Sequence, residues 1–153
     1  KRLLTDDVSQ ELLRHKAAEK IIPPETLQSV QQTEPDFARR GCREIGELCG
    51  ADQVLWIEVQ DFLAKEDVED VAEAAYALVT VRVIDVHAEN KWRVRVWPDN
   101  PQGQVVSAKL SAATVQRAGE RDAIAKDISM SLSRKIARHF YEYRPADFEG
   151  EDE

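Results

Sequence analysis

Three ionisable side chains, Glu58, Asp61 and His87, lie in or beside predicted strands and are the residues best suited to acid–base chemistry. Carboxylates and histidine are common proton donors and acceptors, so such a group could serve an enzyme. Glu58 falls in the apolar run GADQVLWIEVQDF, residues 50–62, where a buried and unpaired carboxylate would be costly. Pairing with an arginine on a neighbouring strand is the simpler explanation of Glu58. A carboxylate enzyme therefore stays an alternative, and no catalytic residue is assigned.

The other histidines and both cysteines lie on predicted helices. His15 and His139 have charged neighbours and are expected to face solvent. Cys42 and Cys49 are separated by seven residues of one helix, which places their α-carbons about 10 Å apart, beyond disulfide reach. We expect two buried thiols and no metal site, because no nearby Cys or His supplies further ligands.

The residues from 75 to 97 predict a β-hairpin that carries positive charge and tryptophan. Apolar and polar side chains alternate along residues 75–87 and again from residue 92, with a turn at 88–90 between them. The hairpin yields a candidate protein-binding surface, composed of Arg82, Trp92, Arg93, Arg95 and Trp97. The same composition could stack single-stranded nucleic acid, or could be an ordinary solvated face in which arginine stems cover tryptophan.

Composition and missing motifs narrow the function classes. The net charge of −8 repels phosphate backbones and so disfavours nucleic acid as a partner. The usual motifs for zinc, for a nucleophilic serine and for nucleotide phosphates are all absent, so we expect neither a cofactor nor an enzyme. No apolar run is long enough for a membrane helix.

The spacing of apolar residues, together with Gly and Pro at boundaries, predicts the helices and strands that must position these residues. The spacing predicts helices at 6–20, 24–32, 34–49 and 120–142, strands at 53–62, 75–87 and 92–97, and a short edge segment, QVVSAKL. Gly50 is expected to end the third helix. Both faces of strand 53–62 begin apolar, which predicts a strand that is central or nearly central in the sheet.

The order of elements predicts an α/β (α+β, two-layer) fold in one domain, residues 1–146. Its mixed sheet of three to five strands would pack against the long carboxyl-terminal amphipathic helix. Residues 64–73 are expected to form an exposed acidic connection, and residues 147–153 a disordered acidic tail.

The stretch REIGELCGADQVLWIEVQDF, followed by a long alternating strand, a tryptophan-containing return strand and the closing helix ISMSLSRKIARHFYEY, resembles small α/β domains of bacterial envelope proteins. The group includes the TolB amino-terminal domain and the CsgG-like lipoproteins, and the matched features span roughly residues 5–142. In that group a helix ends at Gly-Ala-Asp and the chain enters a central strand, as Gly50, Ala51 and Asp52 would here. Such domains usually open with a strand, of which KRLL would be the remnant.

The resemblance implies a non-catalytic role in assembling or linking envelope components, often as a lipoprotein. It therefore predicts a protein partner, a periplasmic or envelope-associated location, and a lipid anchor upstream of Lys1. The carboxylate enzyme and the single-stranded nucleic-acid binder remain the alternatives.

Overall fold

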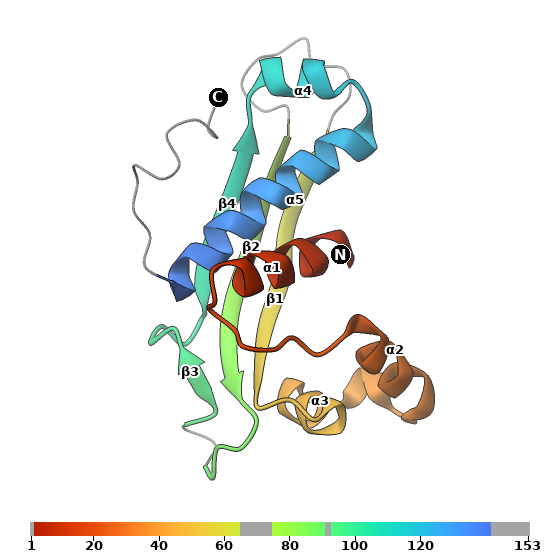
Figure 1. Ribbon diagram of the computed structural model, residues 1–153, viewed down its shortest axis with the longest axis vertical. Coiled ribbons are helices and arrows are strands. Elements are labelled where there is room, and N and C mark those ends of the chain that lie inside the picture. Colours follow the sequence, from red (N-terminus) through yellow and green to blue (C-terminus); the bar gives the residue numbers. More distant parts are fainter. Residues whose placement is uncertain (1, 65–74, 91–92, 142–153) are drawn as a thin grey trace.

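The computed structural model describes residues 2–64, 75–90 and 93–141 as a two-layer α+β fold, which confirms the predicted fold class (Figure 1). The helices are α1 (Arg2–Arg14), α2 (Pro24–Thr33), α3 (Cys42–Cys49), α4 (Ala112–Ala118) and α5 (Arg121–Ala137), with short 3₁₀ turns η1 (Phe37–Arg39) and η2 (Arg138–Phe140). The strands are β1 (Gln53–Ala64), β2 (Ala75–Asp85), β3 (Arg95–Trp97) and β4 (Gln104–Leu110). The predicted acidic connection was 64–73, of which Ala64 ends β1. Residues 65–73, Trp92 and the predicted acidic tail lie outside the described residues.

The sheet is centred on β2 and is antiparallel throughout the described residues, where a mixed sheet was expected. Strand β1 pairs along one side of β2, from Gln53 opposite Asp85 to Ala64 opposite Ala75. Strand β4 pairs along the first part of the other side of β2, and β3 follows it with a short pairing near Val83. Among these strands β1 has one neighbour, so the prediction that residues 53–62 form a central strand is wrong.

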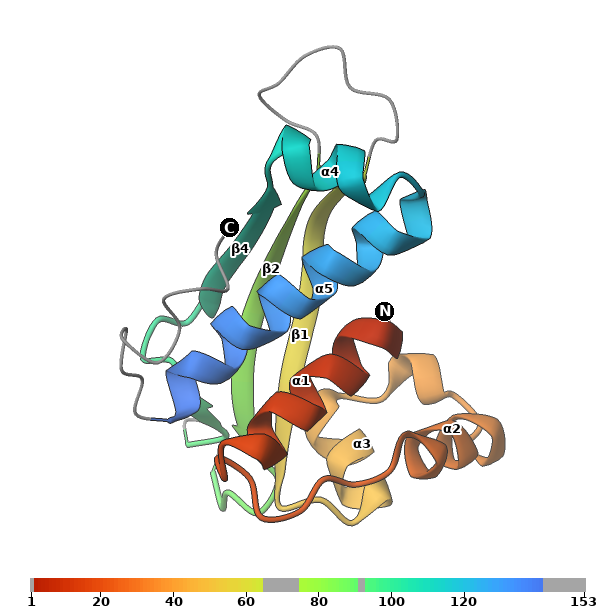
Figure 2. The same cartoon turned by 45° about the horizontal axis from the view of Figure 1, so that its top comes forward.

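Helices α5 and α1 cover one face of this sheet, as both ribbon views show (Figures 1 and 2). Helix α5 supplies an apolar residue at nearly every fourth position, a spacing that gives a helix one buried face. The fully or nearly fully buried core consists of Val8, Leu12, Val79, Val81, Val106, Val115, Ile124, Ile128, Leu132 and Ile136, with several alanines. The buried Ser129 hydroxyl donates a 2.7 Å hydrogen bond to Asp7, which ties α5 to α1.

Helix α1 begins and ends earlier than the predicted helix at 6–20. It starts at Arg2, so the residues KRLL, apart from the undescribed Lys1, belong to a helix and not to an opening strand. It ends because Lys16 adopts a left-handed backbone, with the amides of Lys16 and Ala17 bonded back to Leu13 and Leu12. That is the Schellman ending of a helix, here with lysine where glycine is usual.

The predicted helix at 34–49 is also wrong in its first half. Asp36 has a left-handed backbone, and η1 ends before α3 starts at Cys42. The Glu44 carboxylate accepts a hydrogen bond from the Gly41 amide at the beginning of α3, so the helix is capped at Gly41 and not near residue 34. Gly50 ends α3 with φ of +70°, as predicted. Helix α2 matches its prediction to within one residue.

Candidate functional site

The three residues of the acid–base hypothesis lie apart: Glu58 and Asp61 are on β1, whereas His87 follows β2. The His87 ring is 2.9 Å from the Asp52 carboxylate, and the His87 backbone amide donates to Asp85. Glu58 is six residues beyond Asp52 in an extended strand, which corresponds to about 20 Å. Asp61 lies about 10 Å further on by the same rise per residue. The geometry therefore gathers His87 with Asp52 and not with either predicted carboxylate.

Neither carboxylate of β1 is paired with arginine. Glu58 is exposed opposite Thr80, and none of the ion pairs or hydrogen bonds between described residues engages its carboxylate. The expectation that a neighbouring arginine neutralises Glu58 is therefore wrong. Asp61 is exposed as well, and its carboxylate accepts hydrogen bonds from the Tyr76 hydroxyl and from the Phe62 amide. Both negative charges thus face solvent.

Two arginines of the hairpin, Arg82 and Arg95, donate hydrogen bonds to backbone carbonyls of this chain. Arg95 is half-buried and donates to the carbonyls of Pro98, Asp99 and Pro101, which fixes the loop after β3. Arg82 donates to the Gln102 carbonyl at 3.0 Å. A guanidinium has several donors in a fixed fork, so it suits this kind of loop clamp. Arg93 is exposed in the turn.

The Trp97 side chain packs against other residues of the fold. Its ring meets Phe140 edge-on with 5.0 Å between centroids and lies 5.2 Å from the His139 ring. It is half-buried against the main core cluster, so the expectation that it stands on an exposed face is wrong. The role of the hairpin in binding a partner stays a prediction.

The two helical histidines differ in their surroundings. His139 is exposed, as predicted. His15 is half-buried, with its ring stacked on Tyr141 at 4.0 Å and its Nε2 3.4 Å from Glu11, so the prediction that it faces solvent is wrong. Because α1 and α5 run side by side, the residues that follow them come together.

Cys42 and Cys49 are free thiols at the two ends of α3. Burial raises the pKa of Cys42 to about 11 and also raises the pKa of Cys49. Because the thiolate is the nucleophile, we expect Cys42 at pH 8 to hold about a hundredfold less thiolate than an ordinary cysteine. Iodoacetamide alkylation of Cys42, followed by peptide mass spectrometry, should be slow at pH 8 and should accelerate up to about pH 11. The urea-unfolded chain is the control, and equal rates in the two states would contradict the expectation.

The sheet face opposite α1 and α5 is the surface that sequence reasoning missed. We call it the open face; it consists of Trp56, Glu58, Asp61, Tyr76, Leu78, Thr80, Arg82, Val105, Ser107 and Lys109, which alternate with the core residues of their strands. Trp56 is 40% exposed and Val105 is 58% exposed. An antiparallel sheet often leaves one face to solvent, but that face is then mainly polar. The sequence signal was the alternation of Trp56 and Val105 with core positions.

Two close backbone contacts bound the open face at one end. At Gly46 of α3, a Cβ atom would lie 2.7 Å from a Val54 methyl carbon and 2.6 Å from a Val86 methyl carbon, so the helix backbone rests directly on the beginning of β1. Gly103 approaches Thr80 and Arg82 as closely from the loop before β4. The exposed part of the open face therefore starts at Trp56 and extends toward Asp61 and Lys109.

Within the described ranges, no three side chains of the His, Cys, Asp and Glu types gather as a metal site would require. None of the described helices combines the length and the apolar character needed to cross a bilayer.

Comparisons with known proteins leave the family open. No protein-family model matches the chain, and no curated protein matches it. Among solved structures, the chain is similar to the hypothetical protein CT253 from Chlamydia trachomatis, with 18% sequence identity and a TM-score of 0.47. The similarity covers 89% of this chain and 79% of that one.

Proposed function

We propose that this chain is a non-catalytic protein-interaction module that assembles or links components of the bacterial cell envelope, in the periplasm or attached to a membrane of the envelope. The observation that carries the proposal is the open face, where Trp56 and Val105 remain exposed although the fold has a well-buried core elsewhere. Aromatic and aliphatic side chains bordered by charge are typical of the centre and rim of a protein interface.

The envelope location rests on the resemblance at residues 43–62. There a helix ends at a left-handed Gly50, and the chain enters a long strand through Ala51 and Asp52. The resemblance predicts a central strand after this junction, whereas β1 lies at an edge of the sheet that the described residues form, and it predicts that KRLL is the remnant of a strand, whereas Arg2, Leu3 and Leu4 are helical. The proposal therefore rests more on the open face than on the resemblance.

The alternatives have less support. Glu58, Asp61 and His87 are spread along about 30 Å of strand, which is too far for one substrate to meet all three. Arg82 and Arg95 donate to backbone carbonyls of the loop after β3, so each has fewer donors left for phosphate groups.

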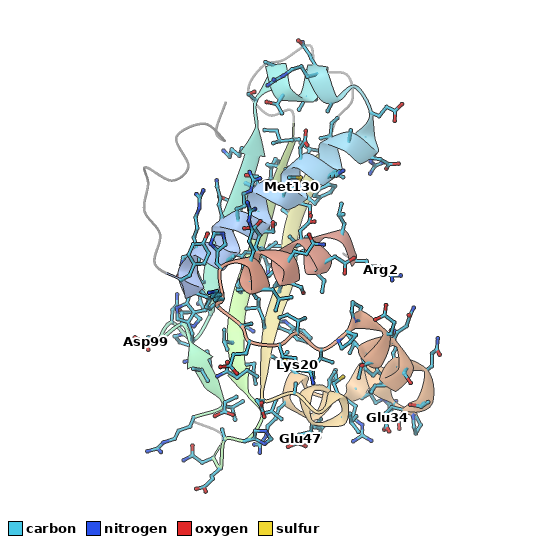
Figure 3. The ribbon with its side chains drawn as sticks, viewed as in Figure 1. Arg2, Lys20, Glu34, Glu47, Asp99 and Met130 are labelled. Atoms are coloured by element: carbon cyan, nitrogen blue, oxygen red, sulfur yellow. The ribbon has the colours of Figure 1, made fainter. Side chains whose placement is uncertain are left out.

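The proposal predicts that a partner contacts the open face in living cells. A photo-reactive amino acid placed at Trp56 or Val105 should cross-link the chain to a specific envelope protein in the source organism. The matched control is Met130, an apolar side chain of similar exposure on α5 in the helical layer (Figure 3). We expect no specific product from that position.

A double substitution then separates binding from folding. Trp56→Ser with Val105→Ser, tested with a photo-reactive group at Ser107, should abolish the cross-link, whereas Met130→Ser should leave it intact. Urea unfolding of both variants checks that the fold persists. Equal cross-linking from Met130 and Trp56, or an unchanged product in the double variant, would count against the open face as the interface.

A further inference from the structure

The outer edge of β1 is an unpaired strand edge of unusual length. Strand β1 has twelve residues and, within the described part of the chain, pairs with β2 alone. Between described residues, no backbone–backbone hydrogen bond outside the regular elements involves residues 53–64, and the side-chain contact to this backbone is the bond that the Phe62 amide donates to Asp61. Figure 1 shows α3 beside the beginning of β1 and no strand along its outer side. The outward-facing amides and carbonyls are therefore available to another extended chain.

Apolar side chains on both faces of this edge are left half-covered. Trp56 projects from the open face, while Val59 and Phe62 lie on the helical face, opposite the buried Val79 and Ala77. Their exposed fractions are 40%, 41% and 43%. A strand added beside β1 would place its own side chains next to all three, one set on each face of the sheet.

The negative charges of Glu58 and Asp61 determine which kind of segment can pair with the edge of β1. The exposed carboxylates of Glu58 and Asp61 flank a β-bulge between Val59 and Asp61. A second copy of this chain would bring these carboxylates toward their own equivalents, and like charges opposite each other on adjacent strands are destabilising. A segment with lysine or arginine at the facing positions would neutralise them. The edge thus opposes self-pairing and favours a basic partner.

The distribution of charge along the chain supports the same choice. Residues 52–73 contain eight acidic residues and one lysine, a net charge of −7, so the remaining residues together contribute −1 to the total of −8. The sequence thus concentrates its negative charge in β1 and the residues that follow. A charge field of this kind raises the rate at which a basic segment meets the surface.

We infer that the free edge of β1 binds an extended segment of a partner protein in which apolar residues alternate with lysine or arginine. The segment adds to the sheet as an antiparallel or parallel strand, its apolar residues covering Val59 and Phe62 on one face and its basic residues lying beside Glu58, Asp61 and the Trp56 ring on the other. The inference rests on the proposed function and names the chemistry of the partner.

The test uses a twelve-residue peptide of alternating lysine and valine with blocked ends, as long as β1 itself. A matched peptide replaces every lysine with glutamate, and another carries N-methyl groups on alternate backbone amides so that it cannot add as a strand. Fluorescence anisotropy measures binding at low salt. Amide-resolved NMR of the full isotope-labelled chain locates the bound peptide. We expect the lysine peptide alone to bind, with protection of outward-facing amides of β1.

Substitutions of the two carboxylates test the charge selection. Glu58→Gln with Asp61→Asn should weaken lysine-peptide binding by about fivefold to tenfold, the loss expected for two solvent-exposed charge pairs. Glu19→Gln with Asp99→Asn removes the same two charges from exposed positions outside β1 and should change binding less than twofold, about the size of a screened long-range effect. Glu58→Lys with Asp61→Lys should transfer the preference to the glutamate peptide.

The inference would be overturned if the lysine peptide does not bind at millimolar concentration, if the N-methylated peptide binds equally well, or if the unmodified chain forms a dimer that protects the β1 edge. Peptide binding that shifts the NMR signals of Arg82 and Val105 but does not protect the β1 amides would also overturn the inference. That result would leave the open face as the interface. Conversely, loss of the cellular cross-link from Val105 together with protection of the β1 amides by the lysine peptide would count against the open face as the interface and would support the strand edge, because Val105 lies on β4, on the other side of β2 from β1.

Discussion

Replacement of Ile136 by alanine is expected to lower the free energy of unfolding by about 3 kcal/mol. Ile136 is completely buried in the cluster that α1 and α5 form over the sheet. Removing three of its side-chain carbons loses their transfer free energy and leaves a cavity that the surrounding strands fill only in part. A domain of this size has a total stability of roughly 5–15 kcal/mol, so the variant should fold but should be markedly less stable.

Urea unfolding followed by circular dichroism measures this change, with the m-value checked for constancy. Met130→Ala is the control, because Met130 lies on the same helix with its side chain 37% exposed and should cost less than about 1 kcal/mol. If both substitutions cost the same, Ile136 does not occupy the buried position that the structure gives it.

Much of the fold follows from local sequence patterns. The alternation at residues 75–87, the strand formers of QVVSAKL and the four-residue spacing from Ile124 to Ile136 predicted β2, β4 and α5, and the structure confirms each element. Gly50 and Pro24 marked helix boundaries for reasons of backbone geometry alone. These signals are local, so a single sequence contains them in full.

Local sequence patterns could not predict that β1 lies at an edge of the sheet. Apolar residues on both faces of a strand suggest burial between neighbours, but here Val54 is covered by the backbone of α3 at Gly46, and Trp56 is left exposed. The number of strands that flank β1 depends on contacts between distant segments. The alternation of side chains within one strand is the same whether that strand has one neighbour or two.

The errors at helix ends have specific causes. Phe37 and Cys42 are five residues apart, a spacing that no continuous helical stripe has, and Gly41 separates their segments. Lys16 ends α1 in a conformation for which glycine is the usual signal. Helix α4 was not predicted, although Ser111 accepts a hydrogen bond from the Thr114 amide at its beginning, because seven residues give too short a periodic pattern.

The predicted binding residues show that residue composition alone does not indicate which side chains lie on an exposed surface. Arginine beside tryptophan suggested an exposed hairpin, yet Arg95 clamps the following loop and Trp97 packs against Phe140. Both residue types serve equally well inside a fold and at an interface. Trp56 and Val105 occupy the open face because their strands turn the opposite set of residues toward α5, which only the register of the sheet reveals.

Substitution of Gly103 by alanine should cost about 3 kcal/mol, for two independent reasons that add. Gly103 has φ of +91°, a backbone conformation that a residue with a side chain adopts only with strain. An added Cβ would also lie 2.5 Å from the Thr80 methyl carbon and 3.0 Å from the Arg82 side chain, so β2 or the loop before β4 must shift. The hydrogen bond from Arg82 to the Gln102 carbonyl lies beside this contact and should weaken with the shift.

Gly50→Ala separates the two causes, because Gly50 has φ of +70° but a Cβ added there would meet no other atom within 4 Å. That variant should show the backbone strain alone, about 1 kcal/mol. Thermal unfolding should then place the melting temperature of Gly103→Ala about 4–8 °C below that of Gly50→Ala, since each kcal/mol corresponds to about 2–4 °C for a chain of this length. Equal melting temperatures would mean that the loop before β4 stands away from Thr80 and Arg82, and that the open face extends further along β2 than the structure places it.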